Sequence, residues 1–392
     1  MEIPIVGQYR LVIKDARGQE VVNEEVAIPD AAHPYLLPLP TTGIYTVEAG
    51  PEGVESMQMA AWNNSDSSLL EVLQFGTVEW RSMYAMFQGC PQMTFAHDID
   101  IPDLSKVTDM SRMFFGCRAF NQPLGQWNVG KVNDMCMMFW GCSTFNQPLG
   151  QWDVGKVMNM SGMFTNCSAF NQPLEEWDVG NVFEMSGMFL GCSAFNQPLE
   201  QWNVENVLEM KEMFLGCSVF NQPLESWNVG HVINMNKMFQ GCRAFNQPLE
   251  EWNVEMVTDM SGMFTGCSSF NQPLGKWNVE NVTGMGTMFS GCSAFNQPLE
   301  EWNVKKVTDM GAMFADCSSF NQPLEKWKVR KRTDLRGMFY NCSAFHQSLK
   351  SWNIDKRPIE AIVDLFIGCP AGDLPFAQKW REEMCKFLRD LL

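Results

Sequence analysis

The sequence predicts an α/β solenoid of about eleven stacked rungs, because a unit of 25 residues recurs along most of the chain with almost no change in length. In its commonest form the unit reads V-T-D-M-S-G-M-F-x-G-C-S-x-F-N-Q-P-L-E-x-W-N-V. A fixed period of this kind is typical of supersecondary units that each contact mainly their neighbours. Cysteine, phenylalanine and tryptophan recur in step, and these ladders begin with Cys117, Cys142, Cys167, Phe120, Phe145, Trp127 and Trp152.

The first half of each unit has the apolar spacing of a short helix. Val107, Met110, Met113 and Phe114 fall at i, i+3, i+6 and i+7, which is one face of a helix of about two turns. A threonine stands near the expected start in several copies, where its hydroxyl can cap free N–H groups. The rest of the unit, with Leu124, Trp127 and Val129, is expected to form a short strand or extended segment.

A glycine position ends the expected helix. It begins with Gly116 and Gly141, and every copy that replaces the glycine has Asn or Asp, as in Asn166 and Asp316. These are the residues that best tolerate the left-handed backbone conformation. We therefore expect positive φ at this position in every rung.

The invariant side chains are expected to form the core. A Trp or Phe side chain buries about 150–250 Å², which at about 25 cal/mol per Å² gives a gross 4–6 kcal/mol each. Asn121 and Asn146 begin a ladder of buried asparagines that bond neighbouring amides and loop backbone. The ladder cysteines are interpreted as free, buried thiols that pack as small hydrophobes, because parallel Cβ atoms about 4.8 Å apart are too distant for a disulfide.

The chain is expected to have three parts. Residues 1–80 do not repeat and contain short strands near 9–14, 21–28 and 43–48, with turns at Gly18, Pro29 and Pro40, so they predict a small β-rich domain or cap. Residues 81–355 form the solenoid. Residues 356–392 hold a last degenerate repeat and an amphipathic helix over 375–391 that is expected to cap the open core, with a partner-binding helix as the alternative.

Composition excludes several functions. The formal net charge of -17 disfavours nucleic acid and anionic membranes. The sequence has no run of eighteen apolar residues, which argues against a transmembrane segment. Neither a C-x-x-C motif nor a histidine cluster is present, so we expect no metal site. Hydrolase, metalloprotease and phosphate-loop motifs are also missing, so we expect no cofactor, no catalytic residue and no enzyme.

Two surfaces are candidate ligand faces, because positions that vary between copies are not dictated by packing. The first is the aromatic pair Phe115 and Trp140, interpreted either as a binding patch or as a contact with the N-terminal cap. The second is an acidic stripe, which reads as a solvated face or as a steering surface that allows weak self-association with a basic cluster at 305–336. Its members are Glu175, Glu200, Glu225, Glu250 and Glu300.

The string M-F-x-G-C-x-x-F-N-Q-P-L-x-x-W-N-V, as at 188–204, resembles the repeat of BspA-like bacterial surface proteins over about residues 81–370. The resemblance implies a leucine-rich-repeat-like solenoid, a cell-surface or secreted location, and non-catalytic adhesion to a protein or cell-surface ligand. The first residues, Met1–Ile5, do not resemble a secretory signal. The alternative is therefore a cytoplasmic scaffold or a neutralising partner of another protein, as a monomer or weakly self-associating.

Overall fold

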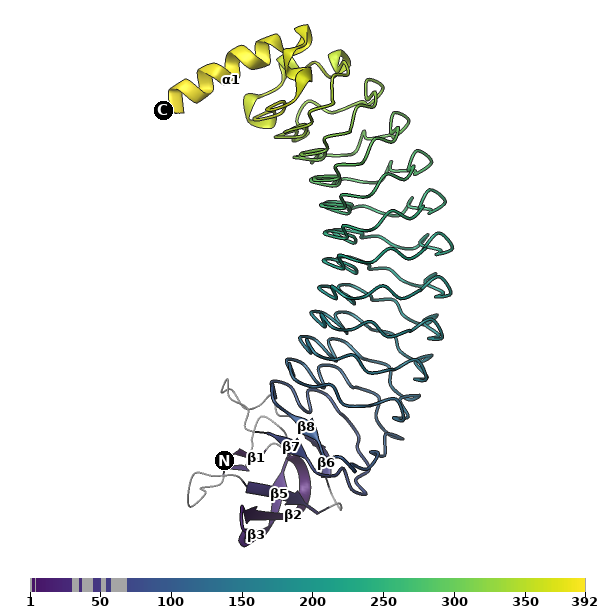
Figure 1. Cartoon of the computed structure of the whole chain (residues 1–392), viewed down its shortest axis with the longest axis vertical. Coiled ribbons are helices and arrows are strands. Elements are labelled where there is room, and N and C mark those ends of the chain that lie inside the picture. The colour runs from purple at the N-terminus through teal and green to yellow at the C-terminus, as the bar shows by residue number, and fades with distance from the viewer. Residues whose placement is uncertain are drawn as a thin grey trace. The chain divides into compact units, whose positions relative to one another are not determined.

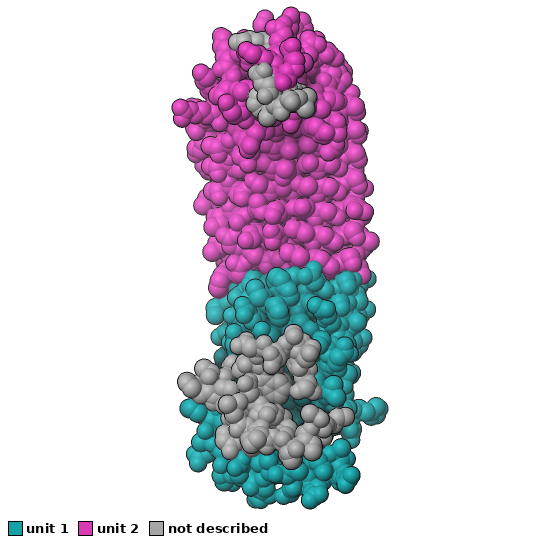
Figure 2. Space-filling view, turned by 90° about the vertical axis from the view of Figure 1, so that its left-hand side faces the viewer, with its two compact units in different colours: residues 1–181 teal, residues 182–392 magenta. Residues whose placement is uncertain are grey.

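The structure is a computed structural model that describes residues 2–3, 5–29, 35–36, 45–50, 54–57 and 69–391 (Figure 1). The chain divides into two compact units, Met1–Asn181 and Val182–Leu392 (Figure 2). Within each unit, most of the chain forms 25-residue coils that stack through backbone hydrogen bonds.

Unit 1 begins with an antiparallel sheet. Strand β2 (Ile5–Asp15) pairs with β3 (Glu20–Ile28), β5 (Tyr45–Ala49) and β6 (Val54–Met57), and β1 (Glu2–Ile3) pairs with β4 (Tyr35–Leu36). Alternate residues of β2 are apolar, so Tyr9, Leu11 and Ile13 are buried on one face. The strands expected near 9–14 and 21–28 and the turn at Gly18 are present, whereas Gly43, Ile44 and Pro40 lie outside the described residues.

The coils follow the sheet. The first pairing is parallel, between β7 (Glu71–Val72) and β8 (Thr94–Phe95). Later coils meet through isolated parallel bridges, one residue per coil, such as Asp109 with Asp134 in unit 1 and Glu209 with Asn234 in unit 2. Of the short strand or extended segment expected near Trp127, the strand is not formed: Leu124–Trp127 is a turn closed by Trp127 N–H and the Leu124 carbonyl, at 3.0 Å, and residues 121–124 and 127–129 are irregular.

The predicted short helix is also wrong: residues 111–116 form a run of turns. Alternate amides bond within the coil and to the next coil. Thus the Met113 amide donates to the Met110 carbonyl, and the Arg112 and Phe114 amides donate to Cys136 and Met138. In a helix these backbone N–H and C=O groups would bond within the same segment. In the stacked coils, alternate N–H groups bond to carbonyls of the next coil. Apolar residues three apart suit successive turns as well as a helix, which explains the error.

Threonines at the expected helix start do not cap it. In unit 2 the hydroxyls of Thr258, Thr283 and Thr308 each donate to the carbonyl of the preceding coil, at 3.2 Å. The donor therefore joins two coils instead of satisfying an N–H group of its own coil.

Positive φ at the glycine position is confirmed. Gly116 and Gly141 have φ of 78° and 77°, and Asn166 and Asp316 have 61° and 59°. A second positive-φ position, four residues earlier, was not predicted, because only some copies have glycine there; it includes Arg112, Met137, Gly162, Glu212 and Thr287. Two such residues per coil produce the tight series of turns.

We expect Gly216→Val to lower the free energy of unfolding by about 2 kcal/mol, because a β-branched residue is strained at the Gly216 φ of 79°. The Gly191 Cα would lie 3.6 Å from the new Cβ, so the γ carbons would also crowd the preceding coil. Gly216→Asn is the matched control, since Asn341 occupies the same place with φ of 55°. Urea denaturation would measure both variants, and equal losses for Val and Asn would contradict the prediction.

Two carbonyls in each coil accept two hydrogen bonds each, and the invariant Cys and Trp supply the second donor. The Phe114 carbonyl accepts from Cys117 N–H, at 3.0 Å, and from the Cys142 thiol of the next coil, at 3.0 Å. The Leu124 carbonyl accepts from Trp127 N–H and from Trp152 Nε1, at 2.9 Å. The thiols are free and buried, as expected, but they are donors as well as small apolar groups.

The asparagine ladder is less buried than expected. Asn121 is exposed and Asn146 is half-buried. The Asn121 Oδ1 accepts from the Asn146 backbone N–H at 2.9 Å and from Gln147 Nε2 at 3.1 Å. The side chain therefore joins two coils at a loop where the backbone lacks a ladder partner.

Unit 2 ends in short 3₁₀ segments, η2 (Lys350–Trp352), η3 (Ile354–Lys356), η4 (Ile359–Ala361), η5 (Pro370–Asp373) and η6 (Pro375–Ala377), followed by helix α1 (Gln378–Leu391). Trp380 of α1 is buried, stacks edge-on against Phe366 at 5.2 Å, and donates from Nε1 to the Ile362 carbonyl. This contact covers the last coil. The side chains of the other apolar residues of the predicted cap lie outside the described part: Phe376, Met384, Phe387, Leu388 and Leu391.

Candidate binding surface

Each coil presents a variable surface, which we call the bridge face. It comprises the residues from the isolated bridge to the positive-φ glycine, 109–116 in the first full repeat and the equivalent residues of later coils. Met110, Met113 and Phe114 point inward and are fully buried. The side chains at positions 111, 112 and 115 differ from coil to coil, and most are half-buried or exposed, although Ser111 and Thr165 are buried. The buried residues thus fix the frame of each coil. The outer side chains take no part in this packing and can differ between coils.

Phe115 and Trp140 lie together on the bridge face of unit 1. Their rings stack with centroids 5.7 Å apart and planes at 17°, so the expected neighbourhood is confirmed. Both side chains are half-buried. Gly162 makes this possible, because a Cβ there would lie 3.0 Å from Trp140 Cε3. The two stacked rings therefore form a preformed apolar surface that is partly accessible to solvent.

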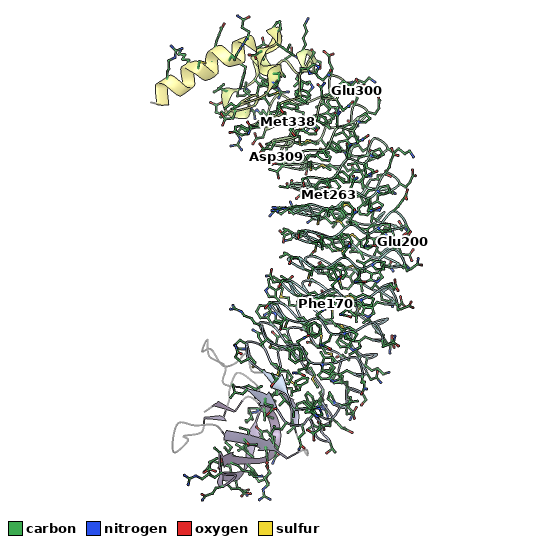
Figure 3. The ribbon with its side chains drawn as sticks, in the orientation of Figure 1. Phe170, Glu200, Met263, Glu300, Asp309 and Met338 are labelled. Carbon is green, nitrogen blue, oxygen red and sulfur yellow. The ribbon has the colours of Figure 1, made fainter. Side chains whose placement is uncertain are left out.

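The predicted glutamates lie elsewhere in the coil, at the turn after Leu124 or its equivalent. In unit 2, Glu200 and Glu300 are on the edge opposite Asp309 of the bridge face (Figure 3). Glu175, Glu200 and Glu225 are exposed, while Glu250 and Glu300 are half-buried.

Lysines neutralise the C-terminal part of this stripe. Lys276 Nζ lies 3.7 Å from Glu250 and 2.5 Å from Glu251, and Lys326 makes the same contacts with Glu300 and Glu301 at 3.4 and 2.6 Å. These carboxylates raise the pKa of both lysines. The two predicted ligand faces are thus separate surfaces, and part of the acidic stripe and of the basic cluster is already paired within unit 2.

Further carboxylates lie on the bridge face in each of the two units, and they were not predicted from the sequence. One Oδ of Asp109, Asp134 and Asp309 accepts from the backbone amide two residues later, at 2.8 Å in each case. Burial, followed by the charge of Asp109, raises the pKa of Asp134. Burial and the charge of Glu184 likewise raise the pKa of Glu209. The signal available in the sequence was the recurrent acid before the first methionine.

The bridge face of unit 2 has a shallow hollow of about 430 Å³. Its lining includes Gly286, Gly311, Asp309, Asp334 and Arg336. Glycines replace the larger residues that other coils carry at this position, which opens the space. The Arg336 guanidinium binds Asp334 through both oxygens. Burial alone would raise the pKa of the Asp334 carboxyl, but the hydrogen bonds and charge of Arg336 lower it.

The described residues contain no group of three His, Cys, Asp or Glu arranged to hold a metal ion. Over the same residues, helices are too short or too polar to span a bilayer. The chemical groups that the coils present are on their surface. They are paired carboxylates, half-buried aromatic rings and exposed apolar side chains, held on a hydrogen-bonded frame.

The stacked coils define a tandem-repeat protein whose recurring units form the frame and whose outer residues vary. The repeats match the family described as "Mycoplasma protein of unknown function, DUF285" three times, at residues 81–201, 172–275 and 258–371. The chain therefore belongs to this family. No curated protein matches the sequence. Comparison with solved structures likewise found no match.

Proposed function

We propose that the protein is a non-catalytic, protein-binding repeat protein whose coils are the rungs, about eleven in all, of a leucine-rich-repeat-like solenoid. The observation that carries the proposal is the contrast, within each coil, between invariant buried residues and variable outer residues. Buried Met, Phe, Cys and Trp side chains recur almost unchanged, whereas outward residues of the bridge face range from Phe115 and Trp140 to Leu190, Gln240 and Tyr340. Such a surface suits a macromolecular ligand better than a small substrate.

The resemblance of the repeat string to BspA-like proteins supports adhesion to a protein or cell-surface ligand, at a bacterial surface or host interface. Exposed carboxylates such as Glu175, Glu200 and Glu225 would then steer association. An intracellular scaffold or neutralising partner is the second candidate, and the buried free thiols support it, because thiols stay reduced in the cytosol. Fractionation of the native cell separates the two: material at the surface or in the medium contradicts the scaffold.

Capture of a defined partner would test the binding function. The wild-type chain, the double variant Phe115→Thr/Trp140→Thr and the edge variant Glu200→Gln/Glu225→Gln would each be immobilised and exposed to surface and cytosolic protein fractions. Threonine occurs at the aromatic position in Thr165 and Thr265, so the frame tolerates it. We expect one specific partner whose affinity falls at least tenfold for the aromatic variant, because the stacked aromatic rings are lost. A partner retained equally by all three, or no partner, would contradict the proposal.

A further inference from the structure

Unit 2 carries a row of exposed apolar side chains that neither the core nor the frame requires. Phe183, Leu208 and Ile233 occupy the same position in three successive coils and are 45%, 44% and 38% exposed. Their backbones are joined directly: the Leu208 amide donates to the Phe183 carbonyl and the Ile233 amide to the Leu208 carbonyl, each at 3.0 Å. We call these three residues the apolar ridge.

The following coils show what the frame itself favours at this position. Thr258, Thr283 and Thr308 stand there, and each hydroxyl donates to the carbonyl of the preceding coil at 3.2 Å. Phe, Leu and Ile lack this hydroxyl donor and stay 38–45% exposed, so they leave apolar surface to the solvent without adding a side-chain hydrogen bond between coils. Exposed apolar rows of this kind mark interaction sites.

Carboxylates border the apolar ridge. Glu184 and Glu209 follow its residues directly in sequence on the bridge face, and Glu205 and Glu255 stand three residues before Leu208 and Thr258. Lys237 is paired with Glu212, at 3.5 Å. The two lysines of this region, Lys211 and Lys237, are thus outnumbered by six carboxylates: Glu184, Glu205, Glu209, Glu212, Glu255 and Asp259. A partner that fits must present apolar side chains flanked by positive charge.

The spacing of the ridge selects the secondary structure of the partner. Hydrogen-bonded neighbours in a ladder lie about 4.8 Å apart. A helix advances about 5.4 Å per turn. Over the two intervals between three coils, its contact residues therefore stay in register with the ridge to within about 1.2 Å. An extended strand repeats a face about every 6.7 Å and loses register by about 4 Å over the same three coils.

We propose that the apolar ridge binds one face of a basic amphipathic helix of a partner protein, laid along the stacking direction of unit 2. The inference rests on the proposed protein-binding function: it adds a second binding surface to that of Phe115 and Trp140 and specifies the chemistry of the partner that this surface takes. Apolar residues of the helix at i, i+3 or i+4 and i+7 contact Phe183, Leu208 and Ile233, and flanking Lys or Arg residues face Glu184 and Glu209.

The probe is a synthetic 18-residue helical peptide with leucines at that spacing and lysines beside them, titrated into the full chain by calorimetry. A peptide with glutamates in place of the lysines is its control. We expect the basic peptide to bind and the acidic one not to. Phe183→Thr/Leu208→Thr/Ile233→Thr should weaken binding at least tenfold with an unchanged melting temperature, since threonine is native at this position. Glu184→Gln/Glu209→Gln should weaken binding several-fold and reduce its salt dependence.

Val219→Thr is the matched variant outside the ridge, since Val219 is 45% exposed and Thr144 occupies the equivalent position, and it should bind the peptide like wild type. If the ridge variant also binds like wild type, the attraction is that of net charge alone and the assignment is wrong. Failure of the basic peptide to bind at millimolar concentration would also overturn it. Either result leaves the broader binding function to stand or fall by the capture experiment, which reports on a different surface.

Discussion

Trp227→Ala should lower the free energy of unfolding by about 4–5 kcal/mol, which is at the upper end for a core substitution. Trp227 is 3% exposed and lies parallel to Trp202 and Trp252, with ring centroids 6.5 and 6.4 Å away. Its Nε1 also donates to the Leu199 carbonyl at 2.9 Å. The substitution removes the packing and this coil-to-coil bond together.

Trp227→Phe separates the two contributions. It keeps most of the aromatic area and loses the donor, so we expect a loss of about 1–3 kcal/mol. Glu225→Ala, an exposed residue of the same coil, should change the free energy by less than about 0.5 kcal/mol. Urea unfolding followed by circular dichroism gives all three values. If the alanine variant stayed within 1 kcal/mol of wild type, the ladder would not be the main support of the stack.

The invariant positions were predictable from the sequence because burial alone fixes them. Phe120 and Phe145 are fully buried and stack at 6.1 Å, as their period requires. The left-handed conformation at Gly116 was predictable too, since Asn and Asp alone replace glycine in the other copies. Both inferences use the repeats as their own comparison set.

The backbone hydrogen bonding was not predictable, for a physical reason. Residues three apart on one face occur in helices and in successive turns, and the choice depends on whether a neighbouring coil accepts the alternate amides. Only the stacked structure shows that the Phe114 amide reaches the Met138 carbonyl. The apolar ridge was not predictable from the sequence, because Phe183 and Leu208 replace a threonine whose position before the first methionine is typical of a helix cap.

The ladder thiols predict a steep loss of stability in alkali. Burial raises the pKa of Cys217 and Cys242 well above the usual range, and that of Cys369 to about 11. An unfolded thiol ionises near pH 8.5. Above that pH the unfolded chain therefore binds fewer protons than the native one, so stability falls as pH rises, by about 1.4 kcal/mol per pH unit for each thiol, and the contribution is fully retained below pH 8.

Burial raises the pKa of eight ladder thiols, namely Cys117, Cys142, Cys217, Cys242, Cys267, Cys292, Cys317 and Cys342. Acting together they would cost about 16 kcal/mol by pH 10, which exceeds the usual net stability of a folded protein. We therefore expect cooperative unfolding between about pH 9 and 10, measured by circular dichroism across a pH series. Lysine and tyrosine also titrate in alkali, so the decisive quantity is the slope of unfolding free energy against pH. Cys217→Ser/Cys242→Ser/Cys267→Ser keeps a hydroxyl donor that does not ionise, and should reduce this slope by about 4 kcal/mol per pH unit. An unchanged slope of unfolding free energy against pH would mean that ionisation of the thiols does not unfold the coils. The burial of the thiols would then have no part in the loss of stability in alkali.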